Sequence, residues 1–301
     1  MRKFLALIAL LAAPAFAGPE LTEPSFWASE VKAGNLPPIQ ERLPDVPLIV
    51  DLEAKGRTFG KQGGTLRTLV TRTKDVRQMV VYGYARLVGY NSEYELYPDI
   101  LRDVEVIEDR KYILHLRPGH RWSDGAPFTS ADFRYWWEKV VNNAEITPSG
   151  PPEFMVVDGK MGRVTFPDDY TVIFEWDTPY ANFLPLLAQA SPPFIYRPAH
   201  YLKQFHIEFA ETEALAAEVR KARVKSWAAL HNKRDNMYKF DNAQQPTLQP
   251  WVNASGRSSR QLFVRNPYYH RIDARGLQLP YIDVVNMTIV GGGLVAAKAN
   301  A

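Results

Sequence analysis

The chain has 301 residues, with 36 Lys and Arg against 33 Asp and Glu, and it contains no cysteine. Hydrophobic residues make up 46% and charged residues 23%, which is typical of a globular protein with a buried core and excludes a disordered or collagen-like chain. The lack of cysteine excludes disulfide scaffolds, cysteine-ligated zinc, iron–sulfur clusters and thiol nucleophiles.

The first 17 residues predict a secretory signal peptide. Arg2 and Lys3 form a positively charged start, residues 4–13 an apolar segment, and Ala-Phe-Ala ending at Ala17 a small-x-small cleavage site. The apolar segment is too short to span a bilayer. Removal of Arg2 and Lys3 lowers the formal charge from +3 to +1, so a nucleic-acid partner is not expected. Export without cysteine favours a bacterial periplasm or cell surface.

A proline-rich leader follows the signal peptide. Residues 18–62 contain six prolines and no sustained hydrophobic period, so we expect an extended or irregular segment that runs over a surface. A glycine pair at 63–64 opens the domain. Residues 65–70 then predict a strand, and residues 75–87 a helix with Asp75 as its N-cap. This order predicts a mixed α/β fold.

Two β-hairpins come next in the chain. Residues 104–107 and 112–116 flank a polar turn, and the second segment alternates apolar and polar side chains. Residues 163–166 and 171–176 surround a Pro-Asp-Asp turn. We interpret both hairpins as sheet and not as a binding site.

The clearest helix start lies between the hairpins. Thr129 is the predicted N-cap, Asp132 completes a shortened capping box, and Phe128 and Phe133 have the spacing of a hydrophobic staple. The apolar stripe of this helix consists of Phe133, Trp136, Trp137, Val140 and Val141. We interpret its tryptophans as core and not as a sugar-stacking platform, because helical periodicity accounts for them.

The last third of the chain predicts one long helix and one strand. Residues 211–230 carry acids in the first half and bases in the second, which favours a solvated helix over a nucleic-acid patch. Residues 281–290 predict a strand, followed by three glycines at 291–293 and a short segment, 294–301.

The sequence contains no strong catalytic or metal-binding pattern. None of the six histidines stands in an H-E-x-x-H arrangement, and a nucleophile elbow, a P-loop and a dinucleotide fingerprint are all absent. One alternative stays open, a secreted carbohydrate-active protein. Its carboxylate pair would come from Glu175, Asp177 or Asp124, and its stacking platforms would be Trp122, Trp176 and Trp251.

Residues 119–132 are similar to a signature of the family 5 extracellular solute-binding proteins, "G-x-x-W-S-D-G-x-P-F-T-A-x-D". These proteins are the peptide- and oligopeptide-binding components of ABC importers. Further family elements stand in the same order here: Gly-Gly-Thr-Leu at 63–66, Tyr-Ala-Arg-Leu-Val at 84–88, Pro-Asp-Ile-Leu at 98–101, Ile-Leu-His-Leu-Arg at 113–117, a Pro-Tyr-containing element at 176–187 and Arg-Asn-Pro-Tyr-Tyr at 265–269. The leader at 36–50 resembles that of a long-chain subgroup. The resemblance extends from about residue 36 to the end.

The resemblance implies an α/β fold like that of type II periplasmic binding proteins, two-lobed when complete. Residues 63–290 would form mainly the first lobe with an inserted subdomain, and residues 291–301 would begin the crossover to a missing second lobe. The family's G-T-G-P-Y turn is not found, and residues 249–252 stand in its place. With one lobe, we expect incomplete folding and much weaker peptide binding than in a two-lobed protein.

By the same resemblance, the protein is the periplasmic component of an ABC importer. It would capture a peptide or similar small solute by hinge closure and deliver it unchanged to a permease and ATPase complex. It would act as a monomer, without a catalytic residue, metal or cofactor. Because relatives also take sugars, nickel chelates or opines, the ligand stays open.

The resemblance places five residues at the ligand cleft. Thr71, Arg72 and Thr73 follow the first strand, and Tyr82 and Tyr84 lie in the next helix. Arg72 has the chemistry to hold a ligand carboxylate in bidentate fashion.

Overall fold

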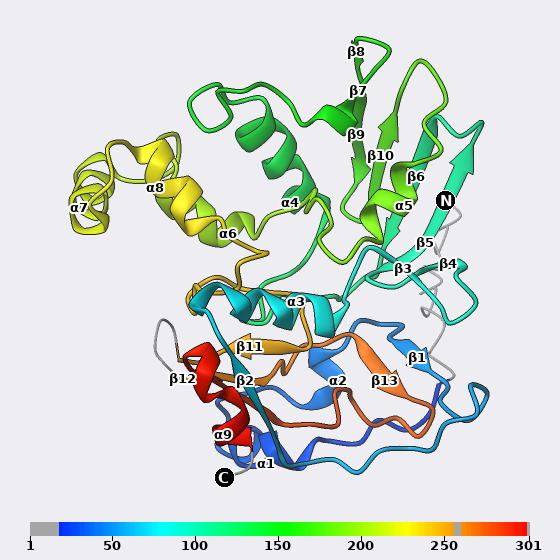
Figure 1. The fold of residues 1–301 in the computed structure, drawn as a ribbon. Helices are drawn as coiled ribbons and strands as arrows, with labels where there is room; N and C mark the ends of the chain where they lie inside the picture. Colours follow the sequence, from blue (N-terminus) through cyan, green and yellow to red (C-terminus); the bar gives the residue numbers. More distant parts are fainter. Residues whose placement is uncertain (1–17, 256–259, 300–301) are drawn as a thin grey trace, which may run out of the picture.

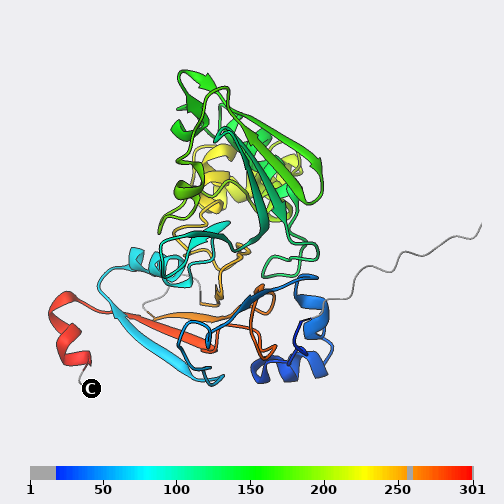
Figure 2. The ribbon, with the colours of Figure 1, turned by 90° about the vertical axis from the view of Figure 1, so that its right-hand side faces the viewer.

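The computed structural model describes residues 18–255 and 260–299. The predicted signal peptide lies outside the described residues. Two four-stranded sheets organise the chain, one above the other in Figures 1 and 2. The lower sheet has the order β11-β12-β14-β2, and the upper sheet has the order β5-β6-β10-β9. The mixed α/β class predicted from the sequence is confirmed.

The lower sheet joins one early strand with three strands from the last part of the described chain. It consists of β11 (Trp251–Asn253), β12 (Arg260–Arg265), β14 (Val284–Ile289) and β2 (Thr65–Val70). β14 pairs with β2 in parallel, and the other neighbours are antiparallel. The strand predicted at 65–70 is confirmed, and the one predicted at 281–290 is shorter at both ends. Phe263, Val285 and Met287 bury their side chains beneath helix α3 (Gln78–Gly83).

The upper sheet is entirely antiparallel, which confirms both predicted hairpins. It consists of β5 (Leu101–Ile107), β6 (Lys111–Leu116), β10 (Thr171–Glu175) and β9 (Arg163–Asp168). Smaller pairs complete the sheet structure: β1 (Leu48–Val50) with β13 (Arg271–Asp273), β3 (Val88–Tyr90) with β4 (Leu96–Pro98), and β7 (Val156–Val157) with β8 (Lys160–Met161).

The remaining helices include α4 (Ser130–Tyr135), a π-helical turn (Trp136–Val141), a 3₁₀ turn (Glu153–Met155), α5 (Phe183–Leu187), α6 (Ala199–Leu202), a 3₁₀ turn (Lys203–Phe205), α7 (Thr212–Ala222) and α8 (Trp227–Arg234). Among them, α4 packs against the upper sheet, and α6, α7 and α8 extend to one side of it (Figure 1). At the end of the described chain, a 3₁₀ turn (Gly292–Leu294) leads into α9 (Val295–Ala299) beside β2.

The leader is more ordered than the sequence suggested. It contains a 3₁₀ turn (Ser25–Trp27), α1 (Ala28–Lys32), α2 (Ile39–Arg42) and β1. Ile39 and Leu43 pack against Ile272, so the expectation of an irregular surface segment is wrong here. Pro38 occupies the position before α2, where the missing N–H breaks no helical hydrogen bond. Proline therefore starts this helix and does not prevent it.

The start of α4 agrees with the sequence prediction. Thr129 Oγ1 accepts a hydrogen bond from Ala131 N (3.3 Å), and Asp132 Oδ2 accepts one from Thr129 N (3.1 Å). The rings of Phe128 and Phe133 lie 5.7 Å apart, as a hydrophobic staple requires. The apolar stripe packs into the core, as predicted.

Two predicted helices end earlier than expected. The helix predicted at 75–87 begins instead as a 3₁₀ turn (Thr73–Arg77) capped by Arg72, and it ends as α3 at Gly83. Asp75 is therefore the third residue of the turn and not the N-cap. The helix predicted at 211–230 is two helices, α7 and α8, because Arg223 adopts the left-handed conformation with φ 53°.

Candidate ligand-binding surface

The candidate site lies where the parallel strands β2 and β14 both end. Val290 N donates to Val70 O at 2.9 Å, and the chain then leaves the sheet through residues 71–74 on one strand and 291–293 on the other. Ligands of α/β proteins commonly bind at the carboxyl ends of parallel strands. This edge therefore has the topology of a binding site.

The loop after β2 is exposed and carries excess positive charge. Thr71, Arg72, Thr73 and Lys74 are all exposed, and 63% of the Arg72 side chain is accessible. Buried Asp75 fixes the loop, because one carboxylate oxygen accepts Arg72 N (3.1 Å) while the other lies 3.4 Å from the Arg72 guanidinium. The fixed backbone and exposed guanidinium suit Arg72 to bind an anion.

The two predicted tyrosines lie in different surroundings. Tyr82, on α3, is 65% exposed, and its hydroxyl donates to Gln78 Oε1 at 3.2 Å. Tyr84 is half-buried in the left-handed conformation, with φ 43°. Its hydroxyl donates to Ala188 O (2.7 Å) and accepts from Tyr90 N (3.2 Å). Tyr82 thus shares the exposure of the loop, whereas Tyr84 is tied into the scaffold.

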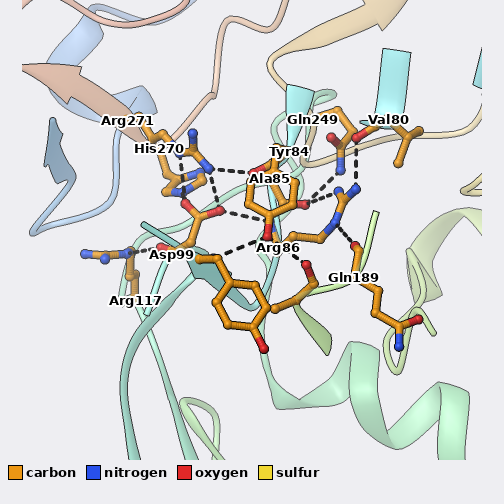
Figure 3. A network of polar contacts seen from close by, with 12 residues as sticks. Val80, Tyr84, Ala85, Arg86, Asp99, Arg117, Gln189, Gln249, His270 and Arg271 are labelled. Atoms are coloured by element: carbon orange, nitrogen blue, oxygen red, sulfur yellow. Dashed lines mark hydrogen bonds and ion pairs between the residues drawn. The ribbon is translucent and has the colours of Figure 1, made fainter. Parts of the chain in front are cut away.

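A buried polar network centred on Asp99 holds Tyr84 in place (Figure 3). Asp99 Oδ1 accepts from His270 Nε2 (2.8 Å) and Arg271 Nε (2.9 Å), and Asp99 Oδ2 accepts from Arg86 N (2.8 Å). Arg271 also donates to the carbonyl of Tyr84 at 2.8 Å. The network therefore connects β13 with the segment that follows α3.

Arg86 extends this network to the far side of the same segment. Arg86 is 1% exposed. Its guanidinium donates to the carbonyls of Val80 (3.1 Å), Gln189 (2.8 Å) and Ala190 (2.7 Å). Gln249 Nε2 donates to Ala85 O at 3.1 Å. These bonds fix the carboxyl end of α3, and with it the direction in which the exposed face of the helix points.

The protonation states in the network follow from burial and charge. Burial alone would raise the pKa of Asp99, but the positive charge of Arg271 and the hydrogen bonds from His270 and Arg271 hold it well below its ordinary value. Burial lowers the pKa of His270 to about 4, although the Asp99 carboxylate opposes this shift. Asp99 is thus ionised beside a neutral histidine, which makes this a structural centre and not an acid–base pair.

The sequence did not reveal the role of this network. Asp99 lies in the Pro-Asp-Ile-Leu element and Tyr84 in Tyr-Ala-Arg-Leu-Val, but His270 and Arg271 are 171 and 172 residues away from Asp99. The spacing of motifs along one sequence gives no indication of such a contact.

The parts of the carbohydrate-active alternative do not form one site. Trp122 and Trp176 are 0% and 1% exposed, so neither offers a ring face to a sugar. Glu175 and Asp177 form ion pairs with Arg163, whereas Asp124 pairs with His200. Half-buried Trp251 donates to Ile282 O at 3.1 Å. The proposed stacking roles of Trp122 and Trp176 are therefore wrong.

Within residues 18–255 and 260–299, no group of three or more His, Asp or Glu side chains is placed to hold a metal ion. In the same ranges, no helix is long and apolar enough to cross a membrane.

Solved structures share this fold over most of the chain. The oligopeptide-binding protein OppA superposes with a TM-score of 0.81 and 34% identity, covering 93% of this chain and 43% of that chain. The periplasmic binding protein MelB from Agrobacterium fabrum, in complex with stachyose, has a TM-score of 0.69 and 25% identity, covering 91% of this chain and 42% of that chain.

Curated relatives are similarly longer than the matched region. The periplasmic alpha-galactoside-binding protein of Rhizobium meliloti is 27% identical over 294 residues, or 88% of this chain and 38% of the relative. The periplasmic murein peptide-binding protein MppA of Escherichia coli is 29% identical over 114 residues, or 34% of this chain and 21% of the relative. The chain thus spans well under half the length of these periplasmic relatives.

The family assignment rests on a match over more than half of the sequence. Residues 95–300 match the profile of the bacterial extracellular solute-binding proteins, family 5, middle region. This is a family of solute-binding proteins and not of enzymes. The α/β fold expected for a type II periplasmic binding protein agrees with the solved relatives. The chain belongs to the bacterial extracellular solute-binding proteins of family 5.

Proposed function

We propose that this protein is the periplasmic solute-binding component of an ABC importer, and that it captures a peptide. Residues 1–17 would direct export, and the captured solute would pass unchanged to a permease and ATPase complex. The observation that carries the proposal is the exposed, cationic loop at the carboxyl ends of β2 and β14 in a family 5 fold. The similarity to an oligopeptide-binding protein supports it.

The charges around the loop favour a ligand with a carboxylate. Arg72, Lys74 and Arg77 lie within six residues of one another, and Asp75 alone opposes them. Because a peptide carries a terminal carboxylate, Arg72 would bind that group, with Thr71 and Thr73 supplying hydroxyls and Tyr82 a ring face. Tyr84 would contribute through the scaffold, since its hydroxyl already bonds Ala188 and Tyr90.

An α-galactoside is a second candidate solute. The alpha-galactoside-binding relative and the stachyose-bound structure each cover about nine-tenths of this chain. Such a sugar is uncharged, so it would gain little from the positive loop and would depend on hydrogen bonds and on stacking with Tyr82.

Titration calorimetry with three ligands separates the candidates. The ligands are a short peptide, the same peptide with an amidated carboxyl end, and stachyose. If Arg72 binds the carboxylate, Arg72→Ala weakens binding of the free peptide by about tenfold or more and barely affects the amidated one. Arg102→Ala, an exposed arginine on β5, is the matched control.

Each outcome of the titration has a defined meaning. Binding of stachyose without binding of either peptide would replace the first candidate with the second. Equal weakening of both peptides by Arg72→Ala would contradict the carboxylate role. Turnover of any of the three ligands would overturn the solute-binding proposal itself.

A further inference from the structure

Helix α7 stands beside a hollow that no part of the proposed peptide site uses. One face of α7 borders this hollow, and α6 with the following 3₁₀ turn forms the opposite wall. We call it the polar hollow and define it by Tyr201, Gln204, Phe205, Ala214, Arg234 and Gln244. Its volume of about 670 Å³ lies within the range of small-molecule sites, about 300–1,000 Å³.

The charged side chains around the polar hollow compensate one another. Both carboxylate oxygens of Glu211 accept backbone N–H groups at the start of α7, from Glu213 (3.0 Å) and Ala214 (2.7 Å). Glu218 pairs with Lys221 (3.0 Å) and Arg234 (3.0 Å). Two acids and two bases thus leave no net charge here, and an ionic ligand would have to break an existing pair.

Uncharged hydrogen-bonding groups remain available on the walls. Tyr201 accepts from Asn242 Nδ2 (2.9 Å), which leaves its hydroxyl hydrogen without an acceptor among the described residues. Gln244 accepts from Arg234 through Oε1 (3.4 Å), and its Nε2 has no partner in the same ranges. The exposed amide of Gln204 is likewise without a hydrogen bond within the described chain.

Aromatic surface lies next to these polar groups. The rings of Tyr201 and Phe205 meet edge to face at 5.3 Å, and the Arg234 guanidinium lies 5.1 Å from the centre of the Phe205 ring. Tyr201 and Phe205 are each only 7% exposed, so the ring surface open to a ligand is that of Phe209, which also lines the hollow and is 45% exposed. On the α7 side, Ala214 leaves space in front of these rings because its side chain is a single methyl group.

We propose that the polar hollow binds a neutral saccharide. Amide and phenol groups match sugar hydroxyls, the exposed ring of Phe209 matches the apolar face of a sugar ring, and the compensated charges favour an uncharged ligand over a peptide terminus. The site is separate from residues 71–74, since α7 lies at the outer side of the molecule in Figure 1, beyond α6 and α8.

The test fills the hollow without altering the core. Ala214→Trp places an indole in the polar hollow, whereas Ala216→Trp, on the same helix, fills the apolar hollow bounded by Leu215, Val219 and Trp227. Both alanines are exposed, so both variants are expected to fold. Saturation-transfer NMR with stachyose and with maltotriose measures binding to the two variants and to the parent protein.

We expect the parent protein to bind at least one of the two sugars. Ala214→Trp should weaken this binding about tenfold or more, and Ala216→Trp should retain it. Gln204→Leu should weaken the same binding while leaving the fold unchanged by circular dichroism. No binding of either sugar, or equal binding in all variants, overturns the proposal. Sugar binding that Tyr82→Ala abolishes and Ala214→Trp leaves intact also overturns it, and would instead support the second candidate solute.

Discussion

His270 makes the stability of this protein depend on pH. It is completely buried and donates to Asp99 Oδ1 at 2.8 Å, and burial lowers its pKa from 6.5 to about 4. An unfolded histidine takes up a proton near its ordinary pKa, whereas folded His270 does not. Its contribution is therefore present above about pH 6.5 and is lost as the pH falls toward 4.

His270→Gln should flatten this dependence. Glutamine keeps an N–H donor for Asp99 but does not titrate, so the free energy of unfolding should fall less between pH 6.5 and 4 than in the parent protein. Urea unfolding at several pH values measures the slope. His115→Gln, outside the core beside Glu105, is the control for replacing a histidine with glutamine. An unchanged slope in His270→Gln would contradict the argument.

At the scale of elements, the sequence predicted the beginnings and types of segments better than their ends. The start of α4 was predictable because its cap, box and staple are side chains with fixed spacing. The ends of α3 and α7 were not, because the left-handed residues there are Tyr84 and Arg223. Glycine usually marks this position, and without it a helical pattern gives no reason to stop.

Asp132 holds the start of α4, and its loss should cost more than an ordinary cap. Its carboxylate accepts three donors: Trp122 Nε1 (3.2 Å), Thr129 N (3.1 Å) and Ala199 N (3.1 Å). Burial raises its pKa to about 6, against these hydrogen bonds. Asp132→Asn turns one acceptor into an N–H that faces a donor, so we expect a loss of about 2–4 kcal/mol.

The matched control for Asp132→Asn is Glu138→Gln in the next helical turn. Glu138 is exposed and pairs with Arg134 at 3.4 Å, so the change should cost less than about 0.5 kcal/mol. Thermal and urea unfolding at about pH 8 compare the two variants. A similar small loss in both would show that the capping carboxylate is dispensable.

At the scale of the whole molecule, the sequence predicted the fold class and the exposed loop but not what connects the sheets. Signature elements at 84–88, 98–101 and 265–269 identified the family by their order. The structure shows that residues within or next to these three elements meet around Asp99, where the Arg86 backbone N–H and the Arg271 side chain both donate to its carboxylate. A contact between distant segments depends on the three-dimensional arrangement, which one sequence does not contain.

We expect the loss of Arg271 to weaken the connection between the two sheets. It comes from β13, next to the lower sheet, and bonds both oxygens of fully buried Asp99, which precedes β5 of the upper sheet. Arg271→Met would leave that carboxylate and the Tyr84 carbonyl short of donors, so we expect a loss of about 3–5 kcal/mol. Arg275→Met, at an arginine that is 49% exposed and pairs with Asp273, should cost less than about 1 kcal/mol.

Hydrogen exchange followed by mass spectrometry tests whether Asp99 couples the sheets. In the parent protein, amides of β13 and of β5 should exchange through the same global unfolding. The reason is that opening either strand alone would separate buried Asp99 from Arg271 and leave a charge without its partner. In Arg271→Met, β13 should exchange at least about tenfold faster than β12, while β5 keeps the protection of its own sheet. Equal acceleration of β13 and β12, with β5 following them, would mean that Arg271 stabilises the molecule generally and that the Asp99 network is not what joins the sheets.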